Sequence, residues 1–568
     1  MTAQNGGTLR EAWALARPYW FSEERWTARL LLAAIIGMSL GLVGINVRLN
    51  YWRADFYNAL QNYDESGFFS QIALFTVLAG ISVAVGVYQV YLQRMLEIKW
   101  RRWMTGVYLK EWLGNQTYYR LQLGGDTTDN PDQRIADDLD MFPAHTLNLT
   151  LGLLTNIVQA VSFSMILWSL SGPLTIPLGS LGAVQIPGYM FWAAILYTLI
   201  GTGIAIRLGR PLVGLNFDQQ RFEADLRYSL VRLRENSESV AFYRGEAREF
   251  TVFWNRFGRA FSNFWEIMRR KRLLGFFIGG YSQAAYIFPY LIIVPRFFAE
   301  KLQLGVIQQT AGSFIELQDS LSYLIDSYPE IASWQSEVSR LSAFRAQVAK
   351  IEAAPHPIEI RHEGEGIAVE GLEISLPDGK ILASGLGFEV APGQALLVTG
   401  PTGTGKSTLL RALAGIWPYG RGAVRLGDGP VFFLPQRPYI PLGTLRHALA
   451  YPGEEARFDS ERLAAVLEQA GLGHLTPDLD KADLWAQRLS IGEQQRLAFA
   501  RVFLAEPAIL FLDEASSALD EAGEAHLYQL LRGMPHRPSI VSVGHRASLR
   551  RFHDVVFDLA SSQDKVTA

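Results

Sequence analysis

The sequence has no cysteine among its 568 residues. Disulfide frameworks, thiolate metal sites and cysteine nucleophiles are therefore excluded. The sequence also lacks an excess of charge of one sign, because 52 Lys and Arg nearly balance 55 Asp and Glu, which gives a formal net charge of −3. A protein that binds nucleic acid gathers positive charge on one face, so we expect no nucleic-acid partner.

Long apolar runs are present, and they lie before about residue 330. The hydrocarbon core of a bilayer is about 30 Å thick, and a helix needs about 20 residues to cross it. Clear runs of this kind lie near 29–47, 71–92, 148–170, 188–206 and 273–294. A sixth run, near 304–326, is weaker because polar residues such as Gln308 and Gln318 interrupt it. The sequence predicts an α-helical membrane domain with six transmembrane helices, followed by a soluble domain.

The distribution of Lys and Arg supports counting the sixth run. Positive residues accumulate on the cytoplasmic side of membrane proteins. Arg94 and Lys99 follow the second run, and Arg269 and Arg270 precede the fifth. If the spans alternate in direction, both segments lie on one side, and six spans place the N-terminus and the soluble domain on that same side.

Three segments are expected along the chain. Residues 1–27 read as an amphipathic elbow helix that lies on the surface of the lipid bilayer. Residues 28–354 form the transmembrane domain, with two long polar projections into the cytoplasm. Pro355 and Pro357 mark a linker, after which short strands begin, so the soluble domain occupies 355–568.

A glycine-rich segment follows a short apolar strand at Ala395–Thr399 and precedes an apolar-periodic helix. This order of strand, GxxxxGKS and helix is typical of a phosphate-binding loop, and it disfavours a chance match. The loop's N–H groups turn toward a β-phosphate, Lys406 reaches the β- and γ-phosphates, and the Ser407 hydroxyl binds Mg²⁺. The predicted ATP-binding residues of the loop are Gly400, Pro401, Thr402, Gly403, Thr404, Gly405, Lys406, Ser407 and Thr408.

Two acidic residues, Asp513 and Glu514, follow the apolar strand Ala508–Leu512. A carboxylate at this place can bind Mg²⁺, and a second one beside it can polarise the attacking water. A solvated acidic strand end would be the alternative without the phosphate loop. With that loop in the same domain, we assign Asp513 to the metal and Glu514 to catalysis.

The string LSIGEQQR, from Leu489 to Arg496, lies between these two motifs. It resembles the signature of the ABC ATPase family, which is usually written LSGGQ. The resemblance implies that Ser490 and the backbone of Gly492 contact the γ-phosphate of ATP bound to a second subunit. It also implies a homodimer as the active form.

Three further residues match the family in the same order along the chain. Gln436 follows the apolar strand Val431–Leu434 and resembles the Q-loop residue, which senses Mg²⁺ and couples to the membrane domain. Asp520 ends the string SALD, which resembles the D-loop. His545 follows another apolar strand and resembles the switch histidine that contacts the γ-phosphate.

The sequence departs from the family pattern at two places. Ile491 stands where glycine is usual and Glu493 where glutamine is usual, although the phosphate-contacting positions remain. An aromatic residue that stacks on adenine is expected near Leu376 or Pro377, and neither side chain has a π-face. The base selectivity therefore stays open, and GTP is an alternative nucleotide.

Two polar stretches resemble one branch of the ABC transporters. They are DNPDQRIADD, from Asp129 to Asp138, and the charged stretch from Phe222 to Glu249. That branch comprises the subfamily D half-transporters and the SbmA/BacA-like proteins fused to an ATPase, and it implies a type IV exporter-like fold. The stretches would then be coupling helices, and the alternative is a capped helix start and an ordinary charged helix. The coupling residues expected from the resemblance are Asn130, Asp132, Arg134, Glu223 and Glu238.

The sixth run carries a polar stripe. At 100° per residue its polar side chains fall within one arc of the helix. Carboxylates at the middle of a bilayer cost about 2.5 to 3.5 kcal/mol each, so this arc should avoid lipid. It either lines a central cavity or forms a dimer seam. The candidate path residues are Gln309, Ser313, Glu316, Asp319, Ser320 and Asp326.

The expected function is ATP-dependent import across the bacterial inner membrane. An acidic cavity suits cationic or polar cargo, and the SbmA/BacA resemblance implies antimicrobial peptides or bulky hydrophilic compounds such as cobalamin. ATP and Mg²⁺ are the expected cofactors. Export, fatty-acyl or lipid carriage, and an ATP-gated channel or regulator without transport stay open as alternatives.

Overall fold

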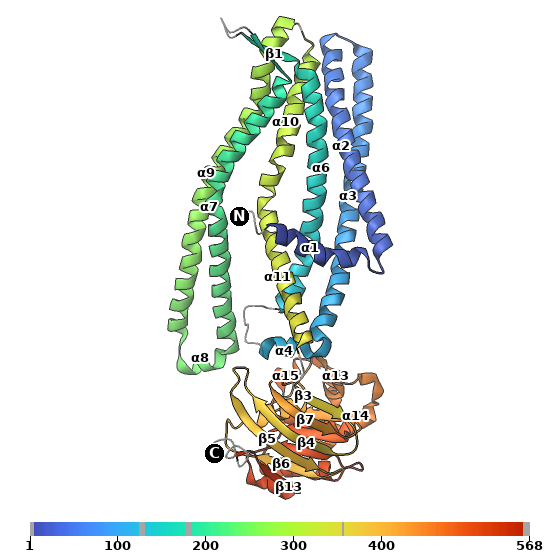
Figure 1. The fold of residues 1–568 in the computed structure, drawn as a ribbon, viewed down its shortest axis with the longest axis vertical. Coiled ribbons are helices and arrows are strands. Elements are labelled where there is room, and N and C mark those ends of the chain that lie inside the picture. Colours follow the sequence, from blue (N-terminus) through green and yellow to red (C-terminus); the bar gives the residue numbers. More distant parts are fainter. Residues whose placement is uncertain (1–4, 124–130, 178–182, 301, 355–356, 561–568) are drawn as a thin grey trace. The chain divides into compact units, whose positions relative to one another are not determined.

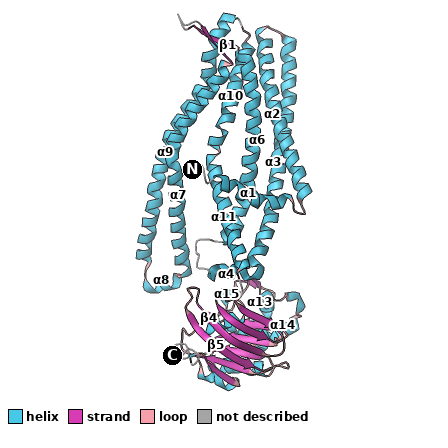
Figure 2. Cartoon of the chain, viewed as in Figure 1, coloured by secondary structure: helices cyan, strands magenta, loops and turns pink. Residues whose placement is uncertain are grey.

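A computed structural model of the chain describes residues 5–123, 131–177, 183–300, 302–354 and 357–560. Its contacts divide the chain into two compact units. The first comprises Met1–Lys110 and Asn130–Ala346, and the second comprises Glu111–Asp129 and Gln347–Ala568. Figure 2 shows that helices make up most of the first unit and that the sheets of the second unit contain most of the strands.

Long helices form the first unit, and long apolar stretches explain most of them. Among the described residues, five helical segments are long and apolar enough to cross a membrane. The helices of this unit are α1 (Asn5–Trp20), α2 (Arg25–Gln61), α3 (Glu65–Leu113), α5 (Pro131–Gln133), α6 (Leu139–Ser171), α7 (Tyr189–Glu235), α8 (Ser237–Tyr243), α9 (Glu246–Glu300), α10 (Leu304–Asp326) and α11 (Tyr328–Ala353), with a π-helical turn over Arg134–Asp138.

The sixth expected span exists as helix α10, although it is not one of the five apolar segments. It packs against α2, α6, α7 and α9 (Figure 1). Most of its residues from Gly305 to Ser320 are buried inside the subunit. Neighbouring helices thus cover a polar helix that would be unstable against lipid alone.

Helix α1 has one face against the bundle and one face outward. Tyr19 is buried and stacks on Trp100 of α3, with ring centroids 5.4 Å apart. Leu9 and Trp13 are exposed. A helix with aromatic and apolar residues on its outer face suits the bilayer interface, and its assignment as an elbow helix stays a prediction.

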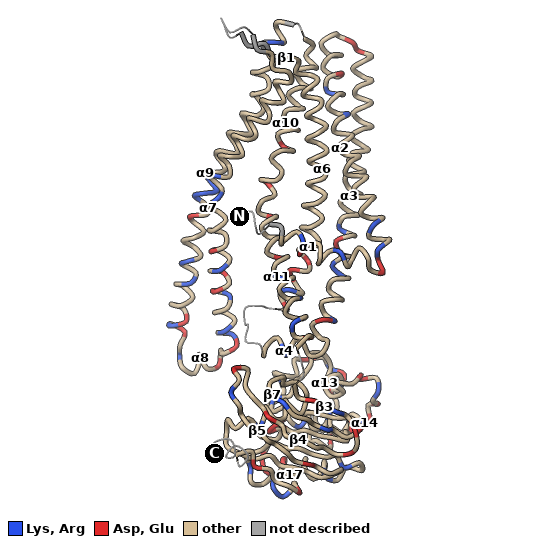
Figure 3. The backbone as a smooth tube through the Cα atoms, viewed as in Figure 1, with Lys and Arg blue, Asp and Glu red and all other residues tan. Residues whose placement is uncertain are grey.

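Helices α7 and α9 run alongside each other and are joined through α8 (Figure 1). Figure 3 shows that charged residues gather on the halves of both helices nearest α8. Between α6 and α7, the strands β1 (Pro173–Pro177) and β2 (Ala183–Pro187) pair as an antiparallel hairpin.

The second unit contains two main sheets. One has five parallel strands in the order β13-β6-β12-β11-β8, and the other has four strands in the order β3-β7-β4-β5. The strands are β3 (Ile358–His362), β4 (Ile367–Ser375), β5 (Ile381–Val390), β6 (Ala395–Thr399), β7 (Gly420–Leu426), β8 (Val431–Leu434), β9 (Gly443–Thr444), β10 (Ala482–Asp483), β11 (Ile509–Asp513), β12 (Ser539–Val543) and β13 (Val555–Asp558).

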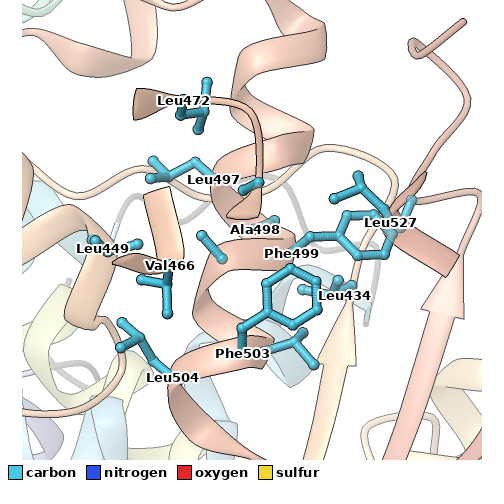
Figure 4. Close-up of a cluster of buried hydrophobic side chains, with 14 of the residues drawn as sticks. Leu434, Leu449, Val466, Leu472, Leu497, Ala498, Phe499, Phe503, Leu504 and Leu527 are labelled. Atoms are coloured by element: carbon cyan, nitrogen blue, oxygen red, sulfur yellow. The ribbon is translucent and has the colours of Figure 1, made fainter. Parts of the chain in front are cut away.

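Helices cover these sheets and enclose two apolar cores. In the first core, Leu434 of β8 and Phe499 of the signature helix α16 belong to one cluster of buried side chains (Figure 4). The helices of this unit are α4 (Thr117–Leu123), α12 (Lys406–Leu413), α13 (Leu445–Ala450), α14 (Ser460–Gln469), α15 (Trp485–Arg488), α16 (Ile491–Ala505) and α17 (Glu521–Arg532), with 3₁₀ turns over Gly114–Gln116, Glu455–Arg457, Gly473–Asp478 and Ala547–Phe552.

Candidate functional site

Strand order explains why distant motifs meet. Strands β6, β12, β11 and β8 are consecutive neighbours in the parallel sheet. Their carboxyl ends therefore reach one edge, where ligands of open α/β sheets commonly bind. The phosphate loop follows β6, Asp513 ends β11, Gln436 follows β8 and His545 follows β12.

The phosphate loop connects β6 to α12 as expected. Gly400, Gly403 and Gly405 have φ values of 145°, 87° and 92°, a region that side chains rarely tolerate. Thr404 donates a hydrogen bond from Oγ1 to the carbonyl of Pro401 at 2.9 Å, which closes the loop on itself. Thr402 lies in this loop, and Thr408 lies in the first turn of α12.

Lys406 begins α12 and turns back over the loop. Its Nζ donates to the carbonyl oxygens of Gly400 and Pro401, both at 2.8 Å. Burial lowers the pKa of Lys406, and the charges of Glu514 and Asp513 oppose that shift. The ammonium group is thus held within the loop that is expected to bind phosphate.

Ser407 and Asp513 come together from α12 and β11. The Ser407 hydroxyl donates to Asp513 Oδ1 at 2.9 Å. Burial raises the pKa of Asp513, whereas the hydrogen bond from Ser407 lowers it. A hydroxyl and a carboxylate this close form an oxygen-rich pair of the kind that Mg²⁺ prefers, so the residues fit the expected metal.

Glu514 lies between two partners that the sequence placed in the same site. Gln436 donates from Nε2 to Glu514 Oε2 at 3.1 Å, and His545 Nε2 lies 3.2 Å from Glu514 Oε1. The backbone at Glu514 has φ 47°, and its N–H donates to the carbonyl of Val543 at 3.1 Å. A bond to β12 thus supports an uncommon conformation that fixes the carboxylate between Gln436 and His545.

The signature segment begins helix α16. The Ser490 hydroxyl accepts from the N–H of Glu493 at 3.3 Å, and Glu493 accepts from the N–H and hydroxyl of Ser490 at 2.9 and 2.8 Å. The unusual Glu493 therefore completes a capping box. A Cβ on Gly492 would lie 3.4 Å from the carbonyl oxygen of Ala518, which is an ordinary van der Waals contact.

Asp520 has a structural contact of its own in the subunit. Its Oδ1 accepts from the N–H of Gly523 at 3.1 Å and caps α17. Leu376, near which a base-stacking residue was expected, lies in a tight turn in which Gly379 N–H donates to its carbonyl at 2.9 Å. The Leu376 side chain packs on the second core.

Two residues that the motif analysis did not assign connect the loops of this site. Gln495 is 1% exposed, and it hydrogen-bonds to residues of the Q-loop and the D-loop. Arg546, the residue after His545, donates to the D-loop carbonyls. The sequence could have indicated that Gln495 is buried, because helical spacing puts it on the same face as the buried apolar residues Ala498 and Phe499.

The six path residues on α10 fall into two groups. Gln309 and Ser313 are buried against α2: Ser313 donates to Asn50 Oδ1 at 3.2 Å, and Asn50 Nδ2 donates to the Gln309 carbonyl at 3.2 Å. Ser320 is also buried, and its hydroxyl donates to the backbone carbonyl of Glu316 at 2.7 Å.

The carboxylates of α10 form the second group. Gln159 of α6 donates to Glu316 Oε2 at 2.5 Å. Asp319 and Asp326 are exposed on the surface of the single subunit. The accessible part of the polar stripe is therefore mainly acidic.

The expected coupling residues lie in different surroundings. Asn130 lies outside the described residues, and Asp132 lies in α5. Arg134 is buried and pairs with Asp138 at 2.9 Å, and Asp138 also accepts from Arg340 of α11 at 2.9 Å. This part of the first projection is thus fixed within the first unit.

A neighbouring segment of the same projection belongs to the second unit. Leu123, at the end of α4, packs against the second core of that unit. In the second projection, Glu223 accepts from Gln219 at 2.8 Å, and Glu238 lies in the first turn of α8.

Comparison with known proteins covers both units. The family model "ABC transporter transmembrane region 2" matches residues 15–298, and the model "ABC transporter" matches residues 383–517. The Arabidopsis thaliana protein "ABC transporter D family member 2, chloroplastic" is 34% identical over 98% of this chain and 86% of its own length.

Two further relatives and one solved structure are similar over most of their length. Escherichia coli YddA, an inner membrane ABC transporter ATP-binding protein, is 32% identical over 96% of this chain and 97% of its own. Human ABCD4, a lysosomal cobalamin transporter, is 30% identical over 89% and 87%. A bacterial Atm1-family ABC exporter with ATP bound matches with a TM-score of 0.74 and 18% identity, over 94% of each chain.

Proposed function

This chain belongs to subfamily D of the ABC transporters, as a half-transporter with a membrane region and an ABC ATPase domain, and we propose that it imports peptides or bulky hydrophilic compounds. It is a multi-pass membrane protein with a type IV exporter fold, and it binds and hydrolyses ATP to drive transport. The direction, the cargo and the roles of individual residues are our proposals.

In the proposed reaction, water attacks the γ-phosphorus of ATP, and the bond from this phosphorus to the β,γ-bridging oxygen breaks. Glu514 accepts a hydrogen bond from the attacking water and orients it, while Gln436 and His545 hold the carboxylate. Lys406 and the N–H groups of the loop from Thr402 to Thr408 bind the phosphates and stabilise the charge that develops on them.

Ser407, Asp513 and Gln436 are the proposed Mg²⁺ ligands. The 2.9 Å approach of Ser407 Oγ to Asp513 Oδ1 supports this assignment. When bound, Mg²⁺ would supply positive charge to the phosphate oxygens. The raised pKa of Asp513 is consistent with a buried carboxylate that lacks a full counter-charge in the protein alone.

A homodimer would complete the site. Ser490, Gly492 and Asp520 would contact ATP bound to Lys406 of the other subunit. In the single subunit, the hydrogen bonds of the Ser490 side chain stay within its own capping box. The match of LSIGEQQR to the ABC signature, which acts on ATP bound to a second subunit, supports this arrangement.

The two inward projections would transmit movement between the domains. Asn130, Asp132 and Arg134 belong to the first, and Glu223 and Glu238 belong to the second. The Arg134–Asp138–Arg340 network supports a rigid first projection, since a buried pair with satisfied partners resists bending.

The proposed cargo is inferred from the acidic surface of α10. Glu316, Asp319 and Asp326 would line the path, and Gln309, Ser313 and Ser320 would support it from behind through contacts within the subunit. Such a path suits cationic or hydrophilic cargo. The resemblance to SbmA/BacA-like proteins favours peptides, and the relative named as a cobalamin transporter makes cobalamin a second candidate. A bacterial inner membrane is the proposed location.

Proteoliposomes can test the direction, because ATP added outside energises only molecules whose ATPase domain faces out. Import then means that cargo leaves the lumen toward the ATP side. We expect ATP to drive labelled cationic peptide out of vesicles whose lumen holds less peptide than the surrounding medium, and Glu514→Gln vesicles to retain their peptide.

Other outcomes would identify the alternatives. Accumulation of peptide or lipid inside the vesicles would overturn import and establish export. Intact ATP hydrolysis with no movement of peptide or cobalamin would contradict the cargo proposal, and passive flux without accumulation would indicate an ATP-gated channel.

A further inference from the structure

The D-loop, Ser517 to Asp520, is held from two sides by side chains that do not belong to the proposed reaction. From α16, Gln495 donates from Nε2 to the Gln436 carbonyl at 3.1 Å and to Ser517 Oγ at 3.2 Å. Its Oε1 accepts from the N–H of Ala518 at 2.9 Å. Both ends of one buried amide are thus used to join the Q-loop to the D-loop.

Arg546 holds the opposite side of the same loop. Its Nη1 donates to the Leu519 carbonyl at 2.8 Å, and its Nη2 donates to the Ser517 carbonyl at 2.9 Å. The guanidinium also lies 3.7 Å from Glu524, whose Oε1 accepts from Ser516 at 2.6 Å. Because Arg546 follows His545 directly, this contact joins the switch histidine segment to the D-loop.

These contacts link two groups of residues with different targets. In the proposed homodimer, Gln436, Glu514 and His545 act on the ATP bound by their own subunit. The signature helix and the D-loop act on the ATP bound by the partner. Gln495 and Arg546 are bonded to both groups within one chain.

We infer that Gln495 and Arg546 are positioning residues that couple the two ATP sites of the dimer. A change at one site moves the Q-loop or the His545 segment, and these hydrogen bonds carry that displacement to the D-loop and so to the other site. The bonds are directional and the Gln495 amide is buried, so the loops cannot shift independently without leaving polar groups unsatisfied. This inference rests on the proposed homodimer.

Mixed dimers of the full chain provide the test. One subunit carries Glu514→Gln, so hydrolysis reports the site built on Lys406 of the other subunit. Gln495→Met, which keeps the length of the side chain and removes its hydrogen bonds, is then placed in either subunit. We expect the turnover number to fall about tenfold in both placements. The KM for ATP should stay within about twofold, because the lost hydrogen bonds position the loops and do not contact the nucleotide.

A fall in only one placement would overturn the inference, because the residue would then serve a single site. No fall in either placement would also overturn it. Gln529→Met on the exposed face of α17 is the matched control, and it should leave turnover unchanged.

The thermal unfolding midpoint separates coupling from loss of the fold. If Gln495→Met lowers this midpoint, Arg546→Lys is tested in its place. The Arg546 side chain is 38% exposed, so its replacement should disturb the fold less. Lysine keeps the charge but cannot bond both D-loop carbonyls in the same geometry. We expect the same fall in both placements, with Arg550→Lys as its control. A rate that falls only in proportion to the loss of folded protein would overturn the inference.

The dimer itself is tested separately in the same preparations. Lys406→Ala in one subunit and Ser490→Arg in the other should disable one common site and leave the second intact. If that pair disables both sites, the proposed dimer fails. If one site survives and the Gln495 and Arg546 variants have no effect, only the coupling inference fails.

Discussion

The nucleotide site and helix α10 both carry polar residues, but their surroundings differ. At the nucleotide site, Glu514 is fixed by Gln436 and His545, and Asp513 is fixed by Ser407. On α10, the buried polar residues contact other polar groups of the same subunit, whereas Asp319 and Asp326 remain exposed. Fixed side chains suit one defined reaction, and an accessible charged face suits cargo of varied shape.

The largest expected effect tests the fixed carboxylate at the nucleotide site. Glu514→Gln keeps the size of the side chain and removes its charge, so ATP should still bind while hydrolysis falls by roughly 10² to 10⁴-fold. Phosphate release and binding of a fluorescent ATP analogue measure the two properties. Glu461→Gln, on the exposed side of α14, is the control. Turnover within threefold of the unchanged protein would remove Glu514 from catalysis.

Nucleotide trapping tests whether each site is shared between subunits. In a dimer in which both subunits carry Glu514→Gln, Lys406→Ala and Ser490→Arg are placed either in different subunits or in the same one. Shared sites predict one trapped ATP per dimer when the changes are in different subunits, and almost none when they are in the same subunit. Equal amounts of trapped ATP in the two arrangements would contradict the assignment of Ser490 to the partner's ATP.

Most of the nucleotide site could be predicted because its motifs are short and act locally. A strand, a glycine-rich turn and a helix place Lys406 and Ser407 whatever the rest of the fold does. The approach of Gln436 and His545 to Glu514 follows from the order of parallel strands. Gln495 was not assigned, since its partners depend on how α16 packs against two loops.

The membrane unit was predicted less completely. Helical periodicity placed the polar residues of α10 in one arc, but it could not tell which neighbours would cover part of that arc. Asn50 of α2 covers Gln309 and Ser313, and this pairing depends on the packing of two helices far apart in the sequence. The π-helical turn at Arg134–Asp138 likewise has no clear sequence signal.

Transport of charged cargo tests the exposed face of α10. With Glu316→Gln, Asp319→Asn and Asp326→Asn combined, movement of a cationic peptide should fall about tenfold, as expected if charge contributes on the order of 1.4 kcal/mol to its binding. ATP hydrolysis without cargo should stay within about twofold, because these groups lie outside the nucleotide site. Transport and hydrolysis are measured in the same proteoliposomes.

A matched control removes the same number of charges from exposed positions at the outer ends of α2 and α3. It combines Asp55→Asn, Asp64→Asn and Glu65→Gln, and it should leave transport unchanged. Unchanged transport in the α10 triple variant would contradict the path assignment. Loss of dimerisation in that variant would instead favour the seam between subunits.

The smallest effect is expected from the buried polar contacts behind the acidic face. Asn50→Leu removes the hydrogen bonds to Ser313 and to the Gln309 carbonyl. Hydrogen bonds between membrane helices contribute about 0.6 kcal/mol each on average and at most about 1.7, so unfolding in detergent should become easier by about that amount. The cargo specificity should not change, because Asn50 is buried and carries no charge.

Leu40→Ala, on the exposed side of α2, is the control for a general loss of helix stability. A change in the ratio of cationic to neutral cargo transported by Asn50→Leu would show that this part of α2 contacts the cargo, and it would remove the distinction between supporting and lining residues on which the proposed path depends.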